Sequence, residues 1–338
     1  MFDIITIGTA TRDVFLKSPL FRVLRDPKYL LCFALGSKIE IKPPIFTTGG
    51  GAANAAVTFS RQDLKVASLI KIGRDESAEY ILKELQKEKI TPLAIKDKNK
   101  KTAYSVILLA PSGERTILVY RGASEDLKIK EIPFNKLKSR WAYISPGNIN
   151  FPVIEKIFNY FSKNKIPIAF NPSKYFLEMG IKKLKPLLAK SKVVILNREE
   201  AAYLTGIDYQ KEKEIFKKLD EVIEGIAIMT QGAKGVLVSD GTRIYQAKAL
   251  RDRKVIDRTG AGDAFASGFV AGLIHEIGNW KLEIRNLPPK TVEYAIHLGS
   301  ANATSVIEHI GAKEGILTKK ELQNPRWRFL KVKIIKIK

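Results

Sequence analysis

The sequence predicts an α/β protein built around a mostly parallel central sheet. From residue 141 onward, short apolar runs typical of buried strands alternate with amphipathic helical segments, and residues 3–7 and 52–88 follow the same scheme. Parallel strands joined by such helices are covered on both faces, which explains why the runs are continuously apolar. The expected strands are residues 3–7, 66–70, 141–144, 167–170, 192–196 and 225–230, and the expected helices are residues 52–61, 77–88, 153–161, 198–205 and 211–223.

Two stretches depart from this alternation. Residues 14–46 contain several prolines and a strand-like run at 38–41, and residues 102–120 read as a hairpin across the turn sequence Pro-Ser-Gly-Glu. Neither offers a helix to the main sheet, so we expect both to form a small β layer over one edge of it. The expected division is a core (1–13, 47–101 and 121–325), this β layer (14–46 and 102–120), and a basic tail or edge strand (326–338).

The composition is that of a protein with a large buried core. Of 338 residues, 45% are hydrophobic and 28% are charged. No apolar run is long enough for a membrane span, and the first residues lack the basic region of a signal peptide, so we expect a cytoplasmic protein with no membrane partner. The single cysteine, Cys32, excludes an internal disulfide.

The formal net charge of +23 predicts a surface that attracts anions such as nucleotides and phosphorylated sugars. The same charge favours loose association with nucleic acid. Because the lysines are scattered over helix faces and mixed with glutamates, we interpret most of them as a solvated surface and expect no specific nucleic-acid partner.

The strongest functional signal is in residues 257–269, which read DRTGAGDAFASGF. Two glycines and an alanine precede an apolar helical run, so the backbone can approach a ligand closely and the helix N-terminus offers unpaired amides to an anion. Asp263 could accept a proton from a hydroxyl while those amides bind developing phosphoryl charge. The alternative is a glycine-rich turn with an aspartate cap.

Three more segments add to this signal. GGGAAN (49–54) opens a small-residue helix, NREE (197–200) follows a predicted strand, and TQGAKG (230–235) follows another. Strand ends of this kind lie where open α/β sheets bind ligands. Asn197 and Glu200 share a helical face and could hold the water shell of Mg²⁺, or could simply cap a helix.

These segments, in this order, resemble the PfkB/ribokinase family of carbohydrate and nucleoside kinases. GGGAAN, with Gly73 downstream, is similar to the family's N-terminal signature, and DRTGAGDAFASGF is similar to its C-terminal one. NREE resembles the N-x-x-E metal motif, and TQGAKG resembles the T-x-G-x-x-G nucleotide motif. The resemblance runs from about residue 3 to residue 311. It implies a ribokinase-like three-layer α/β/α sandwich with a mostly parallel central sheet and a small β lid.

The resemblance also implies a reaction that uses ATP and Mg²⁺. Asp263 would deprotonate the acceptor hydroxyl as it attacks the γ-phosphate, and the amides of Gly260, Ala261 and Gly262 would form the anion hole. Such transfer depends on positioning and charge neutralisation more than on covalent chemistry. The β lid would exclude water and could pair with a second copy as a homodimer.

The remaining implied roles concern binding. Asn197 and Glu200 would position Mg²⁺ through water. The residues expected to line the nucleotide are Thr230, Gly232, Gly235 and, near the adenine, Ser300. The residues expected to contact acceptor hydroxyls are Asp13, Gly50, Gly51 and Asn54. Asp257 and Thr259 match positions that bind a monovalent cation such as K⁺ in some members. Arg258 stands where a small or hydroxyl residue is usual, and Gly51-Ala52 replaces the Lys-Gly of many ribokinases.

Other readings of the sequence fit less well. No segment supplies the G-x-x-x-x-G-K-[ST] of a P-loop, and the chain after the first strand lacks the glycine pattern of a dinucleotide fold. His275-Glu276 lacks the second histidine of a zinc protease. Two alternatives remain open: a nucleoside kinase of the same family, and a non-catalytic protein on this fold that binds nucleic acid or a metabolite.

Overall fold

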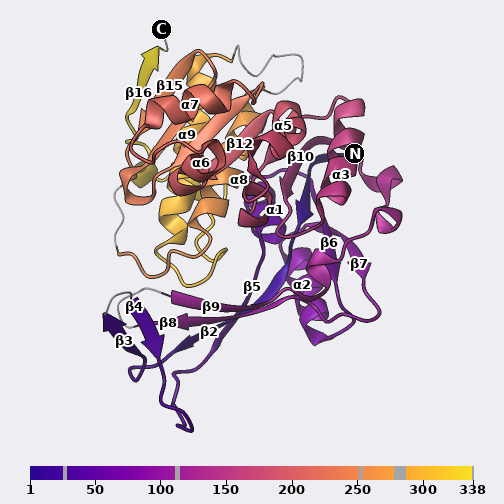
Figure 1. The fold of residues 1–338 in the computed structure, drawn as a ribbon, viewed down its shortest axis with the longest axis vertical. Coiled ribbons are helices and arrows are strands. Elements are labelled where there is room, and N and C mark those ends of the chain that lie inside the picture. The colour runs from indigo at the N-terminus through magenta and orange to yellow at the C-terminus, as the bar shows by residue number, and fades with distance from the viewer. Residues whose placement is uncertain (26–28, 111–114, 251–253, 278–286, 337–338) are drawn as a thin grey trace.

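The computed structural model describes residues 1–25, 29–110, 115–250, 254–277 and 287–336. Its centre is a ten-stranded sheet in the order β16-β15-β14-β13-β12-β11-β10-β1-β6-β7 (Figure 1). The strands from β13 to β7 are parallel, and β14, β15 and β16 extend the sheet antiparallel. The strands are β1 Phe2–Gly8, β6 Val66–Ile72, β7 Thr91–Lys96, β10 Ser139–Ser145, β11 Ile168–Phe170, β12 Val193–Asn197, β13 Ile226–Thr230, β14 Val236–Ser239, β15 Arg243–Ala247 and β16 Val332–Lys336.

Helices cover both faces of this sheet and make the predicted three-layer sandwich. One apolar core lies under α1 Gly51–Arg61, α2 Glu76–Lys87, α8 Ala261–Ile277 and α9 Pro289–Val306. The other lies under α3 Phe151–Lys163, α4 Lys174–Leu177, α5 Gly180–Lys190, α6 Arg198–Thr205 and α7 Glu212–Asp220. Short 3₁₀ turns occur at Gly122–Glu125, Ile129–Glu131, Phe134–Lys136, Gly232–Lys234, Glu321–Gln323 and Pro325–Trp327. No described helix is both long and apolar enough to cross a membrane.

The helix pair α8–α9 sits centrally because small residues let the two backbones meet. A Cβ atom on Gly268 would lie 2.9 Å from the Cα of Gly299, so neither helix could carry a larger side chain there without moving apart. Most of α8 is buried, since it packs against α1, α9 and the sheet at once. This packing fixes where the N-terminus of α8, and therefore Asp263, can lie.

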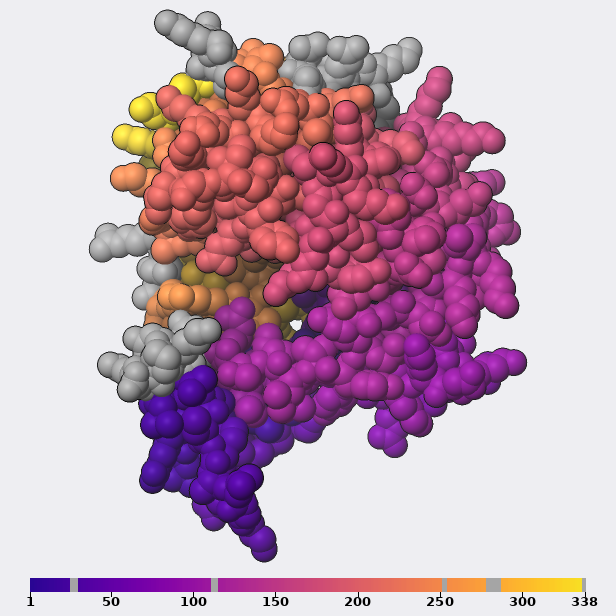
Figure 2. Space-filling model, viewed as in Figure 1, coloured from indigo at the N-terminus to yellow at the C-terminus, as the bar shows by residue number. Residues whose placement is uncertain are grey.

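A second sheet projects from one end of the molecule (Figure 1). Its strand order is β5-β2-β8-β9, and a separate antiparallel pair, β3-β4, lies beyond it. The strands are β2 Thr11–Lys17, β3 Arg22–Arg25, β4 Tyr29–Cys32, β5 Ile45–Gly49, β8 Tyr104–Leu109 and β9 Arg115–Tyr120. Figure 2 shows a hollow between this sheet and the body of the molecule.

The antiparallel pairing of β8 with β9 confirms the predicted hairpin, whose turn at 111–114 lies outside the described residues. The strand expected at 38–41 is wrong. Those residues are mostly exposed and pair with no strand in the described part of the chain, so their apolar side chains are not buried on a sheet. The chain forms the pair β3-β4 instead, from residues 22–25 and 29–32.

Some core elements escaped prediction for identifiable reasons. Helix α5 contains Pro186 and many lysines, which obscured its apolar face. Strand β7 contains Pro92 and is only half-buried, as suits the edge of a sheet. The C-terminal residues 332–336 form β16 by pairing with β15, whereas residues 337–338 lie outside the described part.

Candidate functional site

Several strands of the main sheet end at one edge with a polar residue. Because β10, β11, β12 and β13 are parallel, Ser145, Asn171, Asn197 and Thr230 all lie at their carboxyl ends or directly after them. Asn197 and Thr230 are register partners on neighbouring strands. Open parallel sheets bind ligands at this edge, so these residues define the region in which a site can form.

Asp263 lies in the first turn of α8 and contacts residues from two other segments, α1 and the loop that follows β11. Its Oδ2 accepts a hydrogen bond of 2.9 Å from the Asn54 side chain on α1, and its Oδ1 accepts one of 3.4 Å from Asn171. A Cβ atom on Gly51 would lie 3.7 Å from Oδ1. The structure therefore brings the GGGAAN and GAGD segments together.

The carboxylate of Asp263 lies in a poorly solvated position. Burial raises the pKa of the Asp263 carboxyl, and the hydrogen bond from Asn54 opposes that rise. Two helices, α1 and α8, begin beside it, and the amides of a helix N-terminus favour negative charge. The environment thus contains both a carboxylate with raised proton affinity and donors for an anion.

Two residues in this cluster were missed by the sequence reasoning. Asn171 follows β11 and bridges Asp263 to Tyr143, whose hydroxyl accepts a 3.3 Å hydrogen bond from its amide. Tyr143 is fully buried, and burial together with the nearby charge of Asp263 raises its pKa. Asn171 could have been found from its place between a strand-like run and Pro172, but Tyr143 looked like an ordinary apolar strand position.

The turn before α8 is held in a left-handed conformation that favours glycine. Gly260 has φ = 79°, and a Cβ atom there would lie 2.6 Å from the Cα of Ala312. Gly262 differs, because no atom lies within 4 Å of where its Cβ would be. Gly260 therefore allows a close backbone contact, whereas Gly262 faces open space in which a ligand could lie.

Asp257 anchors this turn from inside the protein. Its fully buried carboxylate accepts hydrogen bonds from the Thr259 amide (2.9 Å), the Thr259 hydroxyl (2.7 Å) and the Gly311 amide (3.0 Å). These contacts explain its burial without an ion, and a monovalent cation at Asp257 and Thr259 stays a prediction.

Asn197 and Glu200 form the capping box of α6. The Asn197 Oδ1 atom accepts from the Glu200 amide and Glu200 Oε2 accepts from the Asn197 amide, both at 2.8 Å. Burial raises the pKa of the Glu200 carboxyl, and the nearby charges of Asp263 and Glu199 raise it further. Glu200 thus serves as a cap and also lies within electrostatic reach of Asp263.

The pair is suited to a hydrated divalent cation. Glu200 is half-buried near a second carboxylate, and an added positive charge would relieve that repulsion. Within the described residues, Glu200 Oε1 and the side-chain nitrogen of Asn197 make no hydrogen bond. Those residues contain no group of three or more His, Cys, Asp or Glu side chains arranged as a metal site.

The 230–235 segment connects β13 to β14 through a 3₁₀ turn. Gly232 has φ = 57° with no atom within 4 Å of where its Cβ would be, so it borders open space. Gly235 has φ = 100°, and a Cβ atom there would lie 2.0 Å from the carbonyl oxygen of Ala247. The first glycine can therefore accommodate a ligand, whereas the second is required by the packing of β15.

Asp13 lies on β2 of the second sheet and is buried. Thr11 donates a 2.8 Å hydrogen bond to its carboxylate, and a Cβ atom on Gly49 would lie 2.0 Å from its Oδ2. Burial raises the pKa of Asp13, opposed by hydrogen bonds from Thr11 and Ser105. Asp13 thus lies beside the strand that leads into Gly50 (φ = 94°) and Gly51.

Ser300 is the predicted site residue with the weakest structural support. It lies in α9, is 7% exposed, and follows Gly299 at the crossing with α8. No contact among the described residues joins it to Asp263, Asn197 or Thr230. Its nearness to an adenine stays a prediction.

Comparisons with known proteins identify the class. A family model described as "pfkB family carbohydrate kinase" matches residues 4–319. A cytidine kinase of Thermococcus kodakarensis is 29% identical over 66% of this chain and 79% of its own length. A ribokinase of Haemophilus influenzae is 28% identical over 81% of this chain and 85% of its own.

Solved structures agree at the level of the fold. An Arabidopsis thaliana ribokinase complexed with ribose and ATP superimposes with a TM-score of 0.76 at 18% identity, covering 97% of this chain and 99% of that one. The fold and the family match together define the protein as a kinase that acts on sugars or nucleosides. The chain belongs to the pfkB family of carbohydrate kinases.

Proposed function

We propose that the protein transfers the γ-phosphate of MgATP to a hydroxyl group of a sugar or sugar-like molecule, with Asp263 as the base. The observation that carries this proposal is the contact between Asp263, at the start of α8, and Asn54, at the start of α1 (2.9 Å). It joins the segment expected to bind the acceptor to the segment expected to bind the phosphate.

Asp263 has the properties that a general base needs. A carboxylate with a raised pKa binds a proton more readily than one in water, and it must still be ionised at the working pH. In the proposed reaction it takes the proton of the acceptor hydroxyl as that oxygen attacks phosphorus. Asn54 and Asn171 orient the carboxylate, since each donates to one of its two oxygens.

The start of α8 supplies the electrostatic part of the proposal. Amides of Gly260, Ala261 and Gly262 lie at a helix N-terminus, where the backbone favours negative charge. The open space beside Gly262 is large enough for a phosphate oxygen to approach the backbone. In this proposal those amides bind the charge that develops on the transferred phosphoryl group.

The nucleotide and the metal are assigned to the neighbouring strand ends. Thr230 is the last residue of β13 and Gly232 and Gly235 follow it, while Asn197 is the last residue of β12 and Glu200 lies in the helix that follows. Mg²⁺ would be held by Asn197 and Glu200 through water and, when bound, would neutralise phosphate charge. The Arabidopsis thaliana ribokinase of the same fold is complexed with ATP, which supports ATP as the nucleotide in this proposal.

The acceptor is assigned to the hollow between the body and the second sheet (Figure 2). In the proposal the acceptor hydroxyls contact Asp13 on β2, Gly50 directly before α1, and Gly51 and Asn54 in α1. In the proposal the second sheet acts as the β lid over the acceptor and keeps water away from the phosphate. Several apolar side chains on β5 and β9 are exposed and could pair with a second copy: Ile45, Phe46, Ile117, Leu118, Val119 and Tyr120.

A panel of acceptors tests the proposal. ADP formation would be measured with pentoses, hexoses, sugar phosphates and nucleosides, in a cytoplasm-like buffer with Mg²⁺, and without acceptor as the control. We expect one class of acceptor to raise the rate above that control. If every acceptor leaves ADP formation at the control rate, the proposed function is wrong.

The second candidate is a nucleoside kinase, which the similarity to a cytidine kinase favours. Faster turnover with adenosine, cytidine or inosine than with any sugar would establish it instead. Salt-sensitive binding of RNA or DNA without turnover on any acceptor would favour the non-catalytic alternative.

A further inference from the structure

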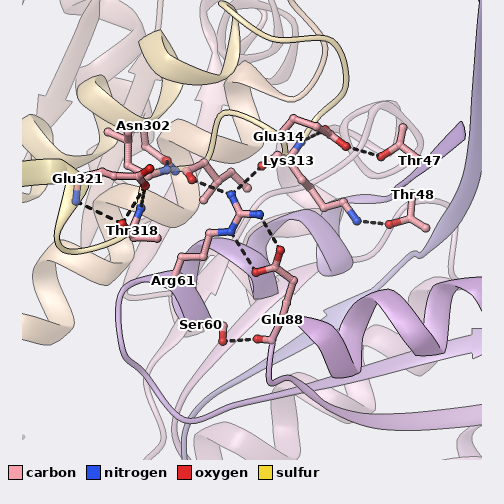
Figure 3. Close-up of polar contacts among 12 residues, drawn as sticks. Thr47, Thr48, Ser60, Arg61, Glu88, Asn302, Lys313, Glu314, Thr318 and Glu321 are labelled. Carbon is pink, nitrogen blue, oxygen red and sulfur yellow. Dashed lines mark hydrogen bonds and ion pairs between the residues drawn. The ribbon is translucent and has the colours of Figure 1, made fainter. Parts of the chain in front are cut away.

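Residues 307–319, which follow α9, form a segment that touches both halves of the candidate site; we call it the strap. It runs from the turn before α8, past the end of β5, to Arg61 at the C-terminal end of α1. Figure 3 shows its contacts with Thr47, Thr48 and Arg61. The strap contains none of the residues assigned above to catalysis. Its contacts nevertheless join the two segments whose relative position the reaction depends on.

The first part of the strap contacts the phosphate half of the site. The Ile307 carbonyl accepts a 2.7 Å hydrogen bond from the Ile256 amide, and the Gly311 amide donates one of 3.0 Å to Asp257. The backbones of Gly260 and Ala312 lie in direct contact. A movement of residues 311–312 would therefore displace the turn that presents Gly260–Asp263.

The next residues of the strap contact the acceptor half. The ammonium of Lys313 donates to the Thr48 hydroxyl, and Glu314 accepts a 2.8 Å hydrogen bond from the Thr47 hydroxyl (Figure 3). Thr47 and Thr48 are consecutive on β5, which continues directly into Gly50 and α1. Ile310 packs against the small apolar cluster of the second sheet.

The strap is also fixed along its length. Arg61 donates to the carbonyls of Lys313 (3.2 Å) and Ile316 (2.8 Å), while its guanidinium forms a two-point contact with Glu88 (2.6 and 3.0 Å). Because Arg61 holds the backbone at Lys313 and Ile316, a displacement at one end of the strap should also displace its other end.

Stability alone does not explain Lys313. Its side chain is only 6% exposed, and burial lowers the pKa of its ammonium even though Glu314, Glu84 and Asp13 oppose that effect. Burying an ammonium that has a neutral hydroxyl as its hydrogen-bond partner costs free energy, and an apolar side chain of similar length would cost less. The position therefore retains an ionisable amine at the expense of stability.

We propose that Lys313 and Glu314 are positioning residues that set the distance and orientation of the acceptor relative to the phosphate site. Through Thr48 and Thr47 they fix β5, and through Ala312 they fix Gly260. The inference rests on the proposed function and extends it. In-line transfer is sensitive to displacements of about 1 Å, so a link of this kind affects the rate without touching either substrate.

The main test is Lys313→Met, which keeps the length and apolar stem of the side chain and removes the ammonium. The control is Lys319→Met, which removes the same charge from an exposed position on the same strap. We expect Lys313→Met to lower kcat by about tenfold or more, to leave the KM for ATP unchanged, and to leave or raise Tm. Lys319→Met should match the wild type.

A second readout separates positioning from folding. Poorly placed acceptor should let water compete, so the ratio of ADP formed to acceptor phosphorylated should rise in Lys313→Met and stay constant in Lys319→Met. Thr48→Val should give the same defect, and the double variant should lose no more activity than either single one, because both remove one link. Glu314→Gln should retain activity that Glu314→Ala loses, since glutamine still accepts from Thr47.

The outcomes are distinguishable. If the wild type is active and Lys313→Met has the same kcat and the same ratio of ADP formed to acceptor phosphorylated, the positioning role is wrong while the proposed function stands. The positioning role is also wrong if Lys313→Met loses activity in parallel with a fall in Tm. Additive losses in the double variant contradict it as well. A wild type that phosphorylates no acceptor contradicts the proposed function, and this inference with it.

Discussion

Replacing Asp263 by asparagine should abolish most turnover and, at neutral pH, stabilise the protein. Asparagine has the same shape, and its side-chain oxygen can still accept the 2.9 Å hydrogen bond from Asn54. The substitution removes the proton-accepting carboxylate. General bases contribute about 10²–10⁴ in rate, so the barrier should rise by about 3–5 kcal/mol.

The stability effect follows from the pKa of the same group. Burial raises the pKa of Asp263 in the folded protein above its value in the unfolded chain. For a carboxyl of this kind, the favourable contribution is fully present below the unfolded pKa and is lost as pH rises through the folded pKa. At pH 7 the ionised form therefore costs stability, and Asp263→Asn should raise Tm by about 1–2 °C.

Two assays and one control test this prediction. Turnover would be followed by ADP formation, and Tm by calorimetry at pH 7 and at a pH near 4, where the stability gain should shrink. Glu199→Gln removes one exposed negative charge beside the site and should change neither quantity appreciably. Turnover of Asp263→Asn within tenfold of the wild type, or a lower Tm at pH 7, would refute the reasoning.

Three further substitutions test other parts of the structure. Gly260→Ala forces a side chain into a backbone contact at positive φ and should lower the free energy of unfolding by about 1–3 kcal/mol. Gly262→Ala should be as stable as the wild type or more so, and yet lose ATP affinity. Equal unfolding midpoints of the two variants in urea would contradict the predicted difference in stability. Glu200→Gln keeps the helix cap but should raise the half-saturating Mg²⁺ concentration about tenfold in an activity titration, and an unchanged titration would remove Glu200 from the metal site. Lys71→Ala removes a buried ammonium that lies 2.9 Å from Glu131 and should lower the free energy of unfolding by about 3–5 kcal/mol. A loss below about 1 kcal/mol would show that this ion pair is dispensable for stability.

The sequence determined the architecture because strand and helix periodicity follow from burial alone. Continuous apolar runs such as 193–196 have no solvated face, which requires a parallel sheet covered on both sides. The same reasoning failed at residues 38–41, where polar and apolar residues alternate but the segment is mostly exposed and joins no sheet. Edge elements such as β7 were missed because half-buried strands carry a weaker pattern.

The residues of the sequence also pointed to Asp263 at a helix start and to Asn197 and Glu200 as a possible metal pair, and the resemblance to a family added Asn54. The sequence could not decide which of these side chains meet. The 2.9 Å contact between Asn54 and Asp263 joins residues 209 positions apart, and it exists because α1 and α8 pack on the same face of the sheet. Local spacing carries no information about such a distance.

Only the tertiary structure revealed Tyr143, Asn171 and the strap. Tyr143 is apolar in pattern, Asn171 stands alone after a short strand, and Lys313 looks like one more surface lysine in a chain that has many. Their significance arises from burial and from partners supplied by other elements. A side chain's solvation and its long-range neighbours are properties of the packed fold, whereas the sequence specifies the local conformations from which that fold is built.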